Sequence, residues 1–297
     1  MSRSAEVSLV LETANVRPWR RIGFQDVVSG WRRQTRADCI REWIVVSGPG
    51  AARAERKLFD DLPVRWLELA DAAYYRQKNA GFAAATCSLV ALADADVLPS
   101  EDWLECAIEA LDRADARVAL VTGRSRYLPG PFAREMALAR MPNHSSQAGD
   151  ATHFLAHNVL LRAGIVRPLG LFREEENRLG PDSDLAHRLL AGGYRLLYDP
   201  KLAATHDCHR QLAGLYRSSV LTGYAFGLFE RSTGRPGPTP LRSFAGRVRA
   251  LVSRLLRGRR DVQIPAWRLP LSLLFCLAYA GAFEHGRRLA LGGRPKP

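Results

Sequence analysis

The chain has 297 residues, of which 47% are hydrophobic and 25% are charged. This composition suffices for a sizeable buried core and excludes a chain that is disordered throughout. The formal net charge is +13, but residues 231–297 alone carry +12, with 14 Lys and Arg against two acidic residues. The basic character therefore belongs to the C-terminal part of the chain.

The cysteines and the N-terminus bear on the compartment. No two of the five cysteines have C-x-x-C spacing, which argues against a disulfide framework or a zinc ribbon and favours a reducing compartment. We interpret them as small buried hydrophobic residues. The N-terminal stretch has only a five-residue apolar run, so we expect no signal peptide and a cytoplasmic location.

Short β-rich runs alternate with helical stretches in residues 6–126. Strands are predicted at 6–12, 42–47, 64–70, 89–96 and 116–127, and helices at 18–34, 54–62, 74–85 and 100–114. This alternation predicts an α/β fold with an open, mostly parallel sheet flanked by helices. Ligands of such sheets bind at the carboxyl ends of the strands.

The chain beyond residue 126 is less regular. Residues 127–152 are rich in turn-forming residues and are predicted to form a mobile surface loop. Further on we predict a strand and turn at 152–165, a helix at 182–193 that ends at two glycines, and a strand that Pro200 closes. We expect residues 1–230 to form one domain and residues 231–297 a basic, membrane-associating helical tail.

Residues 241–256 of the tail have the pattern of a basic amphipathic helix. On a helical wheel the apolar residues lie within about 60° of one direction, and four arginines lie ~100° or more away. The apolar residues are Leu241, Phe244, Val248, Leu251, Val252 and Leu255. Such a pattern is typical of helices that lie on an anionic membrane surface.

A second apolar element, Leu269–Phe283, has 15 residues without charge. As a helix it would span roughly 22 Å, against ~30 Å for a hydrocarbon core, and arginines flank it on both sides. The pattern favours an inserted or re-entrant segment over a crossing one, with packing on the globular domain as the alternative. We therefore expect residues 241–283 to contact an anionic membrane, with the protein peripheral or monotopic on the inner face of the cell membrane.

Two aspartates, Asp94 and Asp96, stand one residue apart at the end of the predicted strand 89–96. Like charges this close repel, so the pair is costly unless a cation lies between them. A hard divalent cation that also coordinates a diphosphate is the obvious occupant. An isolated Asp-x-Asp is more often a solvated turn, so the metal interpretation depends on further features.

Three such features occur. The first is Lys78–Gly81, KNAG, where a lysine, an amide and a closely approaching backbone open a helix and can meet an anion. The second is the pair Asp182 and Asp184 at a helix N-terminus, which offers carboxylates on the acceptor side. The third is His206, which can supply a neutral nitrogen to the same metal.

The ordered set of motifs resembles the family 2 glycosyltransferases of the GT-A fold, over roughly residues 6–225. The motifs are VSLVLETAN, EWIVVS, KNAG, LADADVLPSEDWL, HNVLLR and PDSDLAHRLLAGGYRLLYDPKLAATH. The resemblance implies transfer of a sugar from a nucleotide-diphosphate-sugar donor to an acceptor hydroxyl, with inversion at the anomeric carbon.

The resemblance also implies roles for individual residues. Asp182 matches the catalytic base of the family, and Asp96 and His206 match residues that hold a divalent metal, Mn²⁺ or Mg²⁺. The residues that we assign to the nucleotide-sugar site are Thr13, Asn15, Lys78, Asn79, Asp94 and Asp184.

The chain departs from the family pattern at three points. Ser47 and Gly48 stand where the second strand usually ends in an Asp that contacts the nucleotide base, so the base is not assigned. Pro181 replaces the Glu that usually precedes the catalytic Asp, and the acidic run at residues 173–177 is the substitute source of a carboxylate. The Q-x-x-R-W motif of processive synthases is absent, which indicates transfer of a single sugar to a carbohydrate or lipid-linked acceptor.

Two other functions fit parts of the pattern. LADADVLP also fits the nucleophile strand of haloacid-dehalogenase-type phosphatases, in which Asp94 would be phosphorylated, although that motif usually opens the chain. Pro181 and Ser47 also fit a membrane-recruited nucleotide-sugar-binding module whose catalytic site has decayed. Nucleic-acid binding is not expected, because the basic helix has a strongly apolar opposite face and no aromatic stacking platform is evident.

Overall fold

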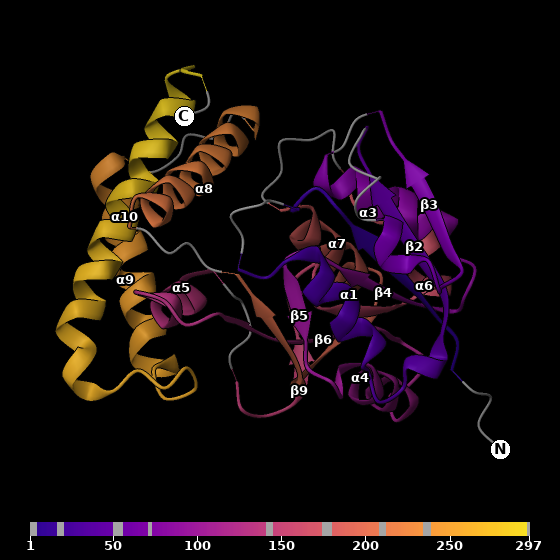
Figure 1. The fold of residues 1–297 in the computed structure, drawn as a ribbon. Coiled ribbons are helices and arrows are strands. Elements are labelled where there is room, and N and C mark those ends of the chain that lie inside the picture. The colour runs from indigo at the N-terminus through magenta and orange to yellow at the C-terminus, as the bar shows by residue number, and fades with distance from the viewer. Residues whose placement is uncertain are drawn as a thin grey trace. The chain divides into compact units, whose positions relative to one another are not determined.

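The computed structural model describes residues 5–16, 21–49, 56–70, 73–140, 145–173, 180–207, 212–233 and 239–295 (Figure 1). The chain divides into two compact units. The first contains a β-sheet with helices packed on it. The second is helical, and its helices are α5 (Ala133–Arg140), α8 (Leu212–Thr233), α9 (Pro240–Gly258) and α10 (Leu269–Leu291). Helix α8, which we expected in the domain 1–230, thus lies in the second unit.

One half of the sheet is parallel, as the strand–helix alternation predicted. Its strands run in the order β3-β2-β1-β4. They are β1 (Val7–Glu12), β2 (Ile40–Ser47), β3 (Val64–Glu68) and β4 (Leu89–Ala93). Every residue of β1 is buried, because parallel neighbours cover both its edges and side chains pack on both its faces. Strands β1, β2 and β4 therefore end together at one edge of the sheet.

The other half of the sheet is antiparallel, so the described sheet is mixed rather than mostly parallel. Beyond β4 the order continues β8-β6-β9-β5, and β7 pairs with β9. These strands are β5 (Val97–Pro99), β6 (Val118–Tyr127), β7 (Gly149–Ala151), β8 (Val159–Arg162) and β9 (Arg195–His206). Because β8 runs antiparallel to β4, the start of β8 lies beside the end of β4.

Strand β9 corrects the prediction that Pro200 closes a strand. The strand continues through Pro200 to His206. Strand β7 pairs with residues 196–198 and β5 with residues 204–206, so Pro200 falls between the two pairings. A proline is tolerated there because these neighbours require no N–H from it. The longer strand carries His206 to a position opposite Val97, just past Asp96.

The helices of the first unit are α1 (Phe24–Arg32), α3 (Tyr74–Ala84), α4 (Trp103–Asp112), α6 (Ala163–Leu169) and α7 (Pro181–Ala191). Helices α3, α6 and α7 share one apolar core with the sheet, which includes Val10 of β1, Phe82, Val166 and Leu185. Helix α1 contacts β5, and α4 contacts β9. A Cβ on Gly81 would lie 2.2 Å from Val10 Cγ1, so this glycine lets α3 approach β1 closely.

The prediction of a loop at 127–152 was wrong. Its described residues form α5 and β7, because Ala133, Met136 and Leu138 are buried in the core of the second unit. The predicted helix 54–62 lies partly outside the described residues. Its described part begins with the helical Arg56 and continues as the short 3₁₀ turn η2 (Lys57–Phe59), beside Trp43 and Trp66, whose rings contact Phe59. Two further 3₁₀ turns are η1 (Ala37–Cys39) and η3 (Ala266–Arg268).

Candidate active site

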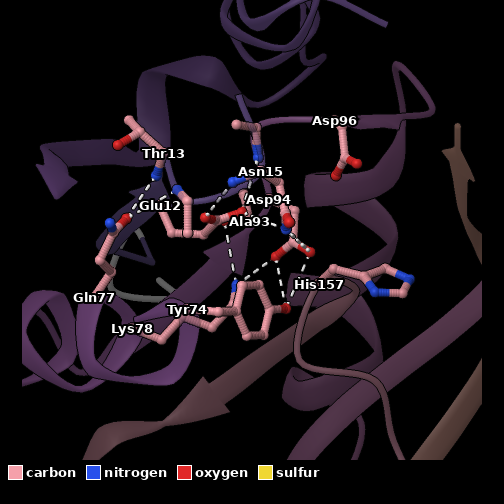
Figure 2. Close-up of polar contacts among 12 residues, drawn as sticks. Glu12, Thr13, Asn15, Tyr74, Gln77, Lys78, Ala93, Asp94, Asp96 and His157 are labelled. Carbon is pink, nitrogen blue, oxygen red and sulfur yellow. Dashed lines mark hydrogen bonds and ion pairs between the residues drawn. The ribbon is translucent and has the colours of Figure 1, made fainter. Parts of the chain in front are cut away.

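Asp94 and Asp96 follow β4 directly and are almost completely buried, with 2% and 1% of their surface exposed. Asp94 is held by two side chains of α3 (Figure 2). The Lys78 ammonium lies 2.6 Å from its Oδ1, and the Tyr74 hydroxyl lies 2.9 and 3.0 Å from its two oxygens. Burial alone would raise the pKa of Asp94, but the adjacent Lys78 charge lowers it below its usual value. Asp94 is therefore a buried carboxylate that stays ionised.

The two polar residues of the KNAG motif, Lys78 and Asn79, make different contacts. Lys78 is fully buried, and its Nζ also donates to the carbonyl of Ala93 at 3.3 Å. Asn79 forms a reciprocal pair with the backbone of Phe172: its Nδ2 donates to the carbonyl at 2.8 Å, and its Oδ1 accepts from the N–H at 3.0 Å. The lysine thus orders the Asp94 end of the site, and the asparagine fixes the chain that leads toward α7.

Glu12, at the end of β1, is a site residue that the sequence analysis missed. Its Oε1 accepts from Asn15 Nδ2 at 2.9 Å and from the Ala95 N–H at 3.3 Å, while Oε2 accepts from the Asn15 N–H at 3.2 Å. Glu12 therefore ties the loop after β1 to the turn between the two aspartates. Burial, together with the charge of Asp94, raises the pKa of Glu12 to about 8.

The loop after β1 is fixed from the other side as well. Gln77 Oε1 accepts from the N–H groups of Thr13 and Ala14 at 2.8 and 3.2 Å. The Thr13 hydroxyl donates to the carbonyl of Val46 on β2 at 3.1 Å, and Asn15 Nδ2 reaches Asp94 Oδ2 at 3.4 Å. The structure thus brings Thr13, Asn15 and Asp94 together at the carboxyl ends of β1, β2 and β4, as Figure 2 shows.

In the metal-free protein, we expect Glu12→Gln to reduce the pH dependence of stability. The folded state keeps Glu12 protonated up to about pH 8, whereas an exposed Glu loses its proton near 4.5. Its contribution to stability is therefore full below the unfolded pKa and decreases as pH rises toward the folded pKa. Gln has no such proton. Urea unfolding at about pH 5 and about pH 8 measures the difference, with the exposed Glu6→Gln as control; equal slopes for wild type and Glu12→Gln contradict the prediction.

Two histidines approach the aspartates from the antiparallel half of the sheet. One ligand atom each of Asp94, His157 and His206 lie within 4.8 Å of one another. His206 Nε2 lies 3.9 Å from Asp96 Oδ1. The Nδ1 of His206 lies 2.7 Å from the carbonyl oxygen of Asp207, so Nδ1 carries the proton and Nε2 keeps its lone pair. With Nδ1 donating, Nε2 is the ring nitrogen on the side of Asp96, which is the arrangement that a metal ligand needs.

His157 was also missed in the sequence analysis. Burial lowers the pKa of His157 to about 3, so the ring is neutral. Its Nε2 lies 3.0 Å from the Ser125 hydroxyl, and the neighbouring Asn158 accepts from the indole N–H of Trp103 at 2.6 Å. The signal in the sequence was HN directly before a buried strand, but only the antiparallel pairing of β8 with β4 brings that position to Asp94.

These side chains fit a divalent cation. They combine carboxylates with neutral imidazoles, a mixed oxygen and nitrogen donor set that suits Mn²⁺ and other first-row metals better than Mg²⁺. Asp96 and His206 are the residues that would hold the ion, with His157 beside them. Asp94 also belongs to this cluster, and it is paired with Lys78; its assignment to the nucleotide-sugar site remains a prediction.

Asp182 lies in the first turn of α7 and is half-buried. Burial raises its pKa to about 6, although the N–H groups of Ser183 and Ala156 hydrogen-bond to it and oppose this rise. Burial, followed by the charges of Asp182 and Asp94, raises the pKa of the Tyr75 hydroxyl. A carboxylate with this pKa can accept a proton near neutral pH.

Asp184 has a different neighbourhood. Its Oδ2 lies 2.8 Å from Nε of Arg188, one turn later on α7. The same guanidinium donates to the carbonyls of Leu169, Gly170 and Leu171. Asp184 thus helps to fix the segment before α7, and its assignment to the nucleotide-sugar site remains a prediction. The acidic run that we considered as a substitute carboxylate source lies, apart from Arg173, outside the described residues, as do Cys208 and His209.

The fold and the site together define a class. A sheet that is parallel around β1 and antiparallel beyond β4, with an Asp-x-Asp turn and a histidine at the strand ends, is that of the GT-A glycosyltransferases. The solved mannosyltransferase PcManGT from Pyrobaculum calidifontis, in complex with GDP-Man and Mn²⁺, matches with a TM-score of 0.63 at 16% identity, over 99% of this chain and 89% of that one. S. aureus TarS 1-349, in complex with UDP-GlcNAc, matches with a TM-score of 0.55 at 12% identity, over 99% and 93%.

The sequence comparisons point to the same family. Residues 49–167 match the model of the glycosyl transferase family 2. The pre-mycofactocin glycosyltransferase of Mycobacterium tuberculosis, in strains CDC 1551 and H37Rv, is 30% identical in an alignment over 210 residues, which covers 62% of this chain and 43% of that protein. These matches confirm the resemblance that the motifs showed, and the chain spans less than half the length of these curated relatives.

Proposed function

We propose that the protein transfers a single sugar from a nucleotide-diphosphate-sugar donor to an acceptor hydroxyl, with inversion at the anomeric carbon and with the help of a divalent metal. Two groups of the first unit support the proposal. One is the buried Asp96 with the Nε2 of His206 directed at it. The other is Asp182, a carboxylate whose pKa is about 6.

The donor site that we propose lies at the carboxyl ends of β1, β2 and β4. Thr13 and Asn15 are fixed there by Gln77 and Glu12, so their loop is held in place before a ligand arrives. The GDP-Man and UDP-GlcNAc complexes of the structurally similar proteins support a nucleotide sugar as the ligand class. Ser47, at the end of β2, is buried where the base of the nucleotide would be read, and the base remains unassigned.

Asp96 and His206 would hold the metal, and a bound divalent cation supplies stabilisation of negative charge on the leaving diphosphate. The chain's own side chains support this role. Lys78 and Tyr74 keep Asp94 charged and fixed, and Glu12 holds the N–H of Ala95, so the turn that bears Asp96 is ordered in advance. Such ordering reduces the reorganisation that charge development requires.

Asp182 is the catalytic base in this proposal. As the acceptor hydroxyl attacks the anomeric carbon, its proton passes to the Asp182 carboxylate, while the bond between the anomeric carbon and the diphosphate oxygen breaks. A pKa of about 6 leaves the carboxylate ionised at neutral pH and still basic enough to accept the proton.

The sequence also suggested two alternatives, a phosphatase and a binding module without catalysis. A phosphatase that uses Asp94 as its nucleophile is disfavoured by the glycosyltransferase family match and the GT-A fold. A nucleotide-sugar-binding module without catalysis keeps the same donor site. Binding of a donor with no transfer or hydrolysis across a broad acceptor panel would favour it.

A thermal-shift screen with nucleotide sugars tests the donor class. At about one hundred times its Kd, a ligand of the folded state adds roughly 2.7 kcal/mol of stability, so a matching donor should raise Tm by several degrees. We expect this shift to be larger with Mn²⁺ than without it. Free sugars and nucleoside monophosphates are the controls. If no nucleotide diphosphate and no nucleotide sugar raised Tm, that result would contradict the proposal.

We also propose that the protein works on the inner face of a membrane, as a peripheral or monotopic protein with a carbohydrate or lipid-linked acceptor. The support is the basic and apolar composition of residues 231–297. Among the described residues, one helical stretch, Ala266–Leu291, is long and apolar enough to cross a membrane by length and composition.

A further inference from the structure

The outer face of α10 exposes a group of large apolar side chains. Leu271, Leu274 and Leu277 are 40%, 60% and 46% exposed, and Trp267 in the preceding turn is 77% exposed. At ~100° per residue, the three leucines lie within about 60° of one direction. The exposed positions that continue this direction are Gly281, His285 and Arg288. The apolar character is therefore confined to the first half of the helix; we call Trp267, Leu271, Leu274 and Leu277 the leucine stripe.

The opposite face of α10 is buried within the second unit, and besides apolar residues it carries polar side chains that have partners there. Arg287, 2% exposed, lies 2.7 Å from Glu230 of α8 and 3.1 Å from Glu284. Nearer the start of the helix, the Ser272 hydroxyl donates to Glu135 of α5 at 2.7 Å, and Arg268 pairs with the same carboxylate at 2.9 Å. Ion pairs and hydrogen bonds thus attach both ends of α10 to its neighbours.

The packing of α10 on α8 is also very close. A Cβ on Gly286 would lie 1.9 Å from the carbonyl oxygen of Val220, and a Cβ on Gly223 would lie 1.8 Å from that of Phe283. If α10 left α8 to cross a bilayer alone, Glu284 and Arg287 would enter hydrocarbon without Glu230. Charged side chains are strongly disfavoured there. Although α10 is long and apolar enough to span, its contacts favour a helix that stays in the unit.

Helix α9 uses its apolar stripe inside the protein. Leu251 and Leu255 are buried, and Phe244, Val248 and Val252 pack against the same core together with residues of α5 and α10. Most of the stripe that we expected on the membrane therefore packs inside the second unit, whereas Leu241 at the start of α9 is 76% exposed. The exposed arginines of α9 and the link after it are Arg242, Arg249, Arg254, Arg257 and Arg260.

The leucine stripe lies near the C-terminal arginines of α9. Helices α9 and α10 run as an antiparallel pair, because Arg247 of α9 lies over the ring of Phe283 at 3.8 Å, while Leu255 shares a core with Phe275. The end of α9 is thus beside the start of α10 (Figure 1). Arg254, Arg257 and Arg260 are therefore at the same end of the helix pair as the leucine stripe. Few acidic side chains balance them, since residues 231–297 contain only Asp261 and Glu284.

We propose that the leucine stripe inserts into the interface of an anionic lipid bilayer, with the arginines at the end of α9 on the lipid headgroups and with α10 lying along the surface without crossing it. Apolar faces of interfacial helices enter roughly 5–10 Å, which is the depth of a row of leucines and a tryptophan. Anionic lipid fits the positive flank, because basic residues near a membrane are attracted to its negative surface potential. This inference rests on the membrane part of the proposed function and not on the chemistry of the first unit.

The test is binding of the full chain to vesicles, without nucleotide or metal. We expect binding to vesicles of phosphatidylcholine with phosphatidylglycerol, much weaker binding to phosphatidylcholine alone, and release at high salt. Leu274→Glu should weaken binding by about tenfold or more, because it replaces an apolar side chain that would contact the lipid by a charged one. The matched control is Leu241→Glu, since Leu241 is 76% exposed at the other end of α9. Circular dichroism verifies that both variants fold.

Three outcomes would overturn the inference. One is equal binding of wild type and Leu274→Glu to anionic vesicles. Another is binding that resists both high salt and alkaline carbonate, which indicates a crossing helix. A third is a lipid-free dimer, seen in sedimentation velocity and abolished by Leu274→Glu, with no vesicle binding; the stripe would then be an interface between copies of this chain. None of these measurements depends on sugar transfer. The vesicle-binding results can therefore be interpreted even if the catalytic proposal fails.

Discussion

Replacing Asp182 by Asn is expected to lower kcat for sugar transfer by about 10² to 10⁴, the range that general-base catalysis contributes. Donor binding should be almost unchanged, because Asn keeps the size of the side chain. Its amide oxygen can still accept the hydrogen bond from the N–H of Ser183, which in the wild-type protein lies 2.9 Å from Asp182 Oδ1. The readouts are turnover under saturating donor and, separately, donor affinity by calorimetry. Ser183→Ala in the same turn of α7 is the matched control, since the hydrogen bond uses the backbone.

The pH profile gives a second readout of the same residue. The pKa of Asp182 is about 6, so the fraction of ionised base falls as pH decreases through that value. Wild-type turnover should therefore fall about tenfold for each pH unit below this point. The residual rate of Asp182→Asn should lack this acidic limb. Unchanged turnover, or an unchanged acidic limb, would remove Asp182 from the role of base.

Replacing His206 by Ala is expected to weaken Mn²⁺ binding by at least about tenfold and to lower metal-dependent transfer in parallel. The reason is that the variant loses Nε2, which lies 3.9 Å from Asp96 Oδ1, together with the hydrogen bond from Nδ1 that fixes the orientation of the ring. Titration of free Mn²⁺ by electron paramagnetic resonance reports binding without any need for activity.

The control for this variant is His285→Ala, which removes an exposed histidine from α10. It should bind Mn²⁺ like the wild-type protein. Mn²⁺ affinity that is equal in wild type and His206→Ala would show that the ion is held elsewhere. If Mg²⁺ bound as tightly as Mn²⁺, the two neighbouring histidines would not be acting as ligands, because imidazole favours the transition metal.

Local sequence patterns were sufficient for the parallel half of the sheet. The strands β1 to β4 are short apolar runs, α3 lies before β4, and α4 follows it. The spacing of apolar residues and the alternation of strands with helices were therefore enough to predict these elements. The position of Asp94 and Asp96 at a strand end followed from the same pattern. The sequence could not reveal that β9 continues through Pro200, because this depends on where β7 and β5 stop pairing.

The site was predictable only in part for the same reason. Asp94, Asp96 and Lys78 come from neighbouring segments of a regular α/β pattern, and their assembly follows from strand order. His157 and Glu12 carry no motif that stands out, and each gains its meaning from a partner far along the chain: Asp94 for His157, and Ala95 for Glu12. The close contact of Lys78 with Asp94 likewise required α3 to pack on β1 through Gly81.

The amino-acid sequence by itself determined the fold class, the Asp-x-Asp turn, the basic C-terminal part and the family, because these depend on local period, composition and ordered motifs. The tertiary structure alone decided which polar side chains meet at the strand ends and which apolar faces are covered. The apolar stripe of α9 and the outer leucines of α10 look equally suited to a membrane in the sequence. Yet most of the α9 stripe, except Leu241, packs in the core of the second unit, whereas the outer leucines of α10 are exposed. The physical reason is that burial and charge pairing are properties of packing between distant segments, and no local pattern specifies the partner.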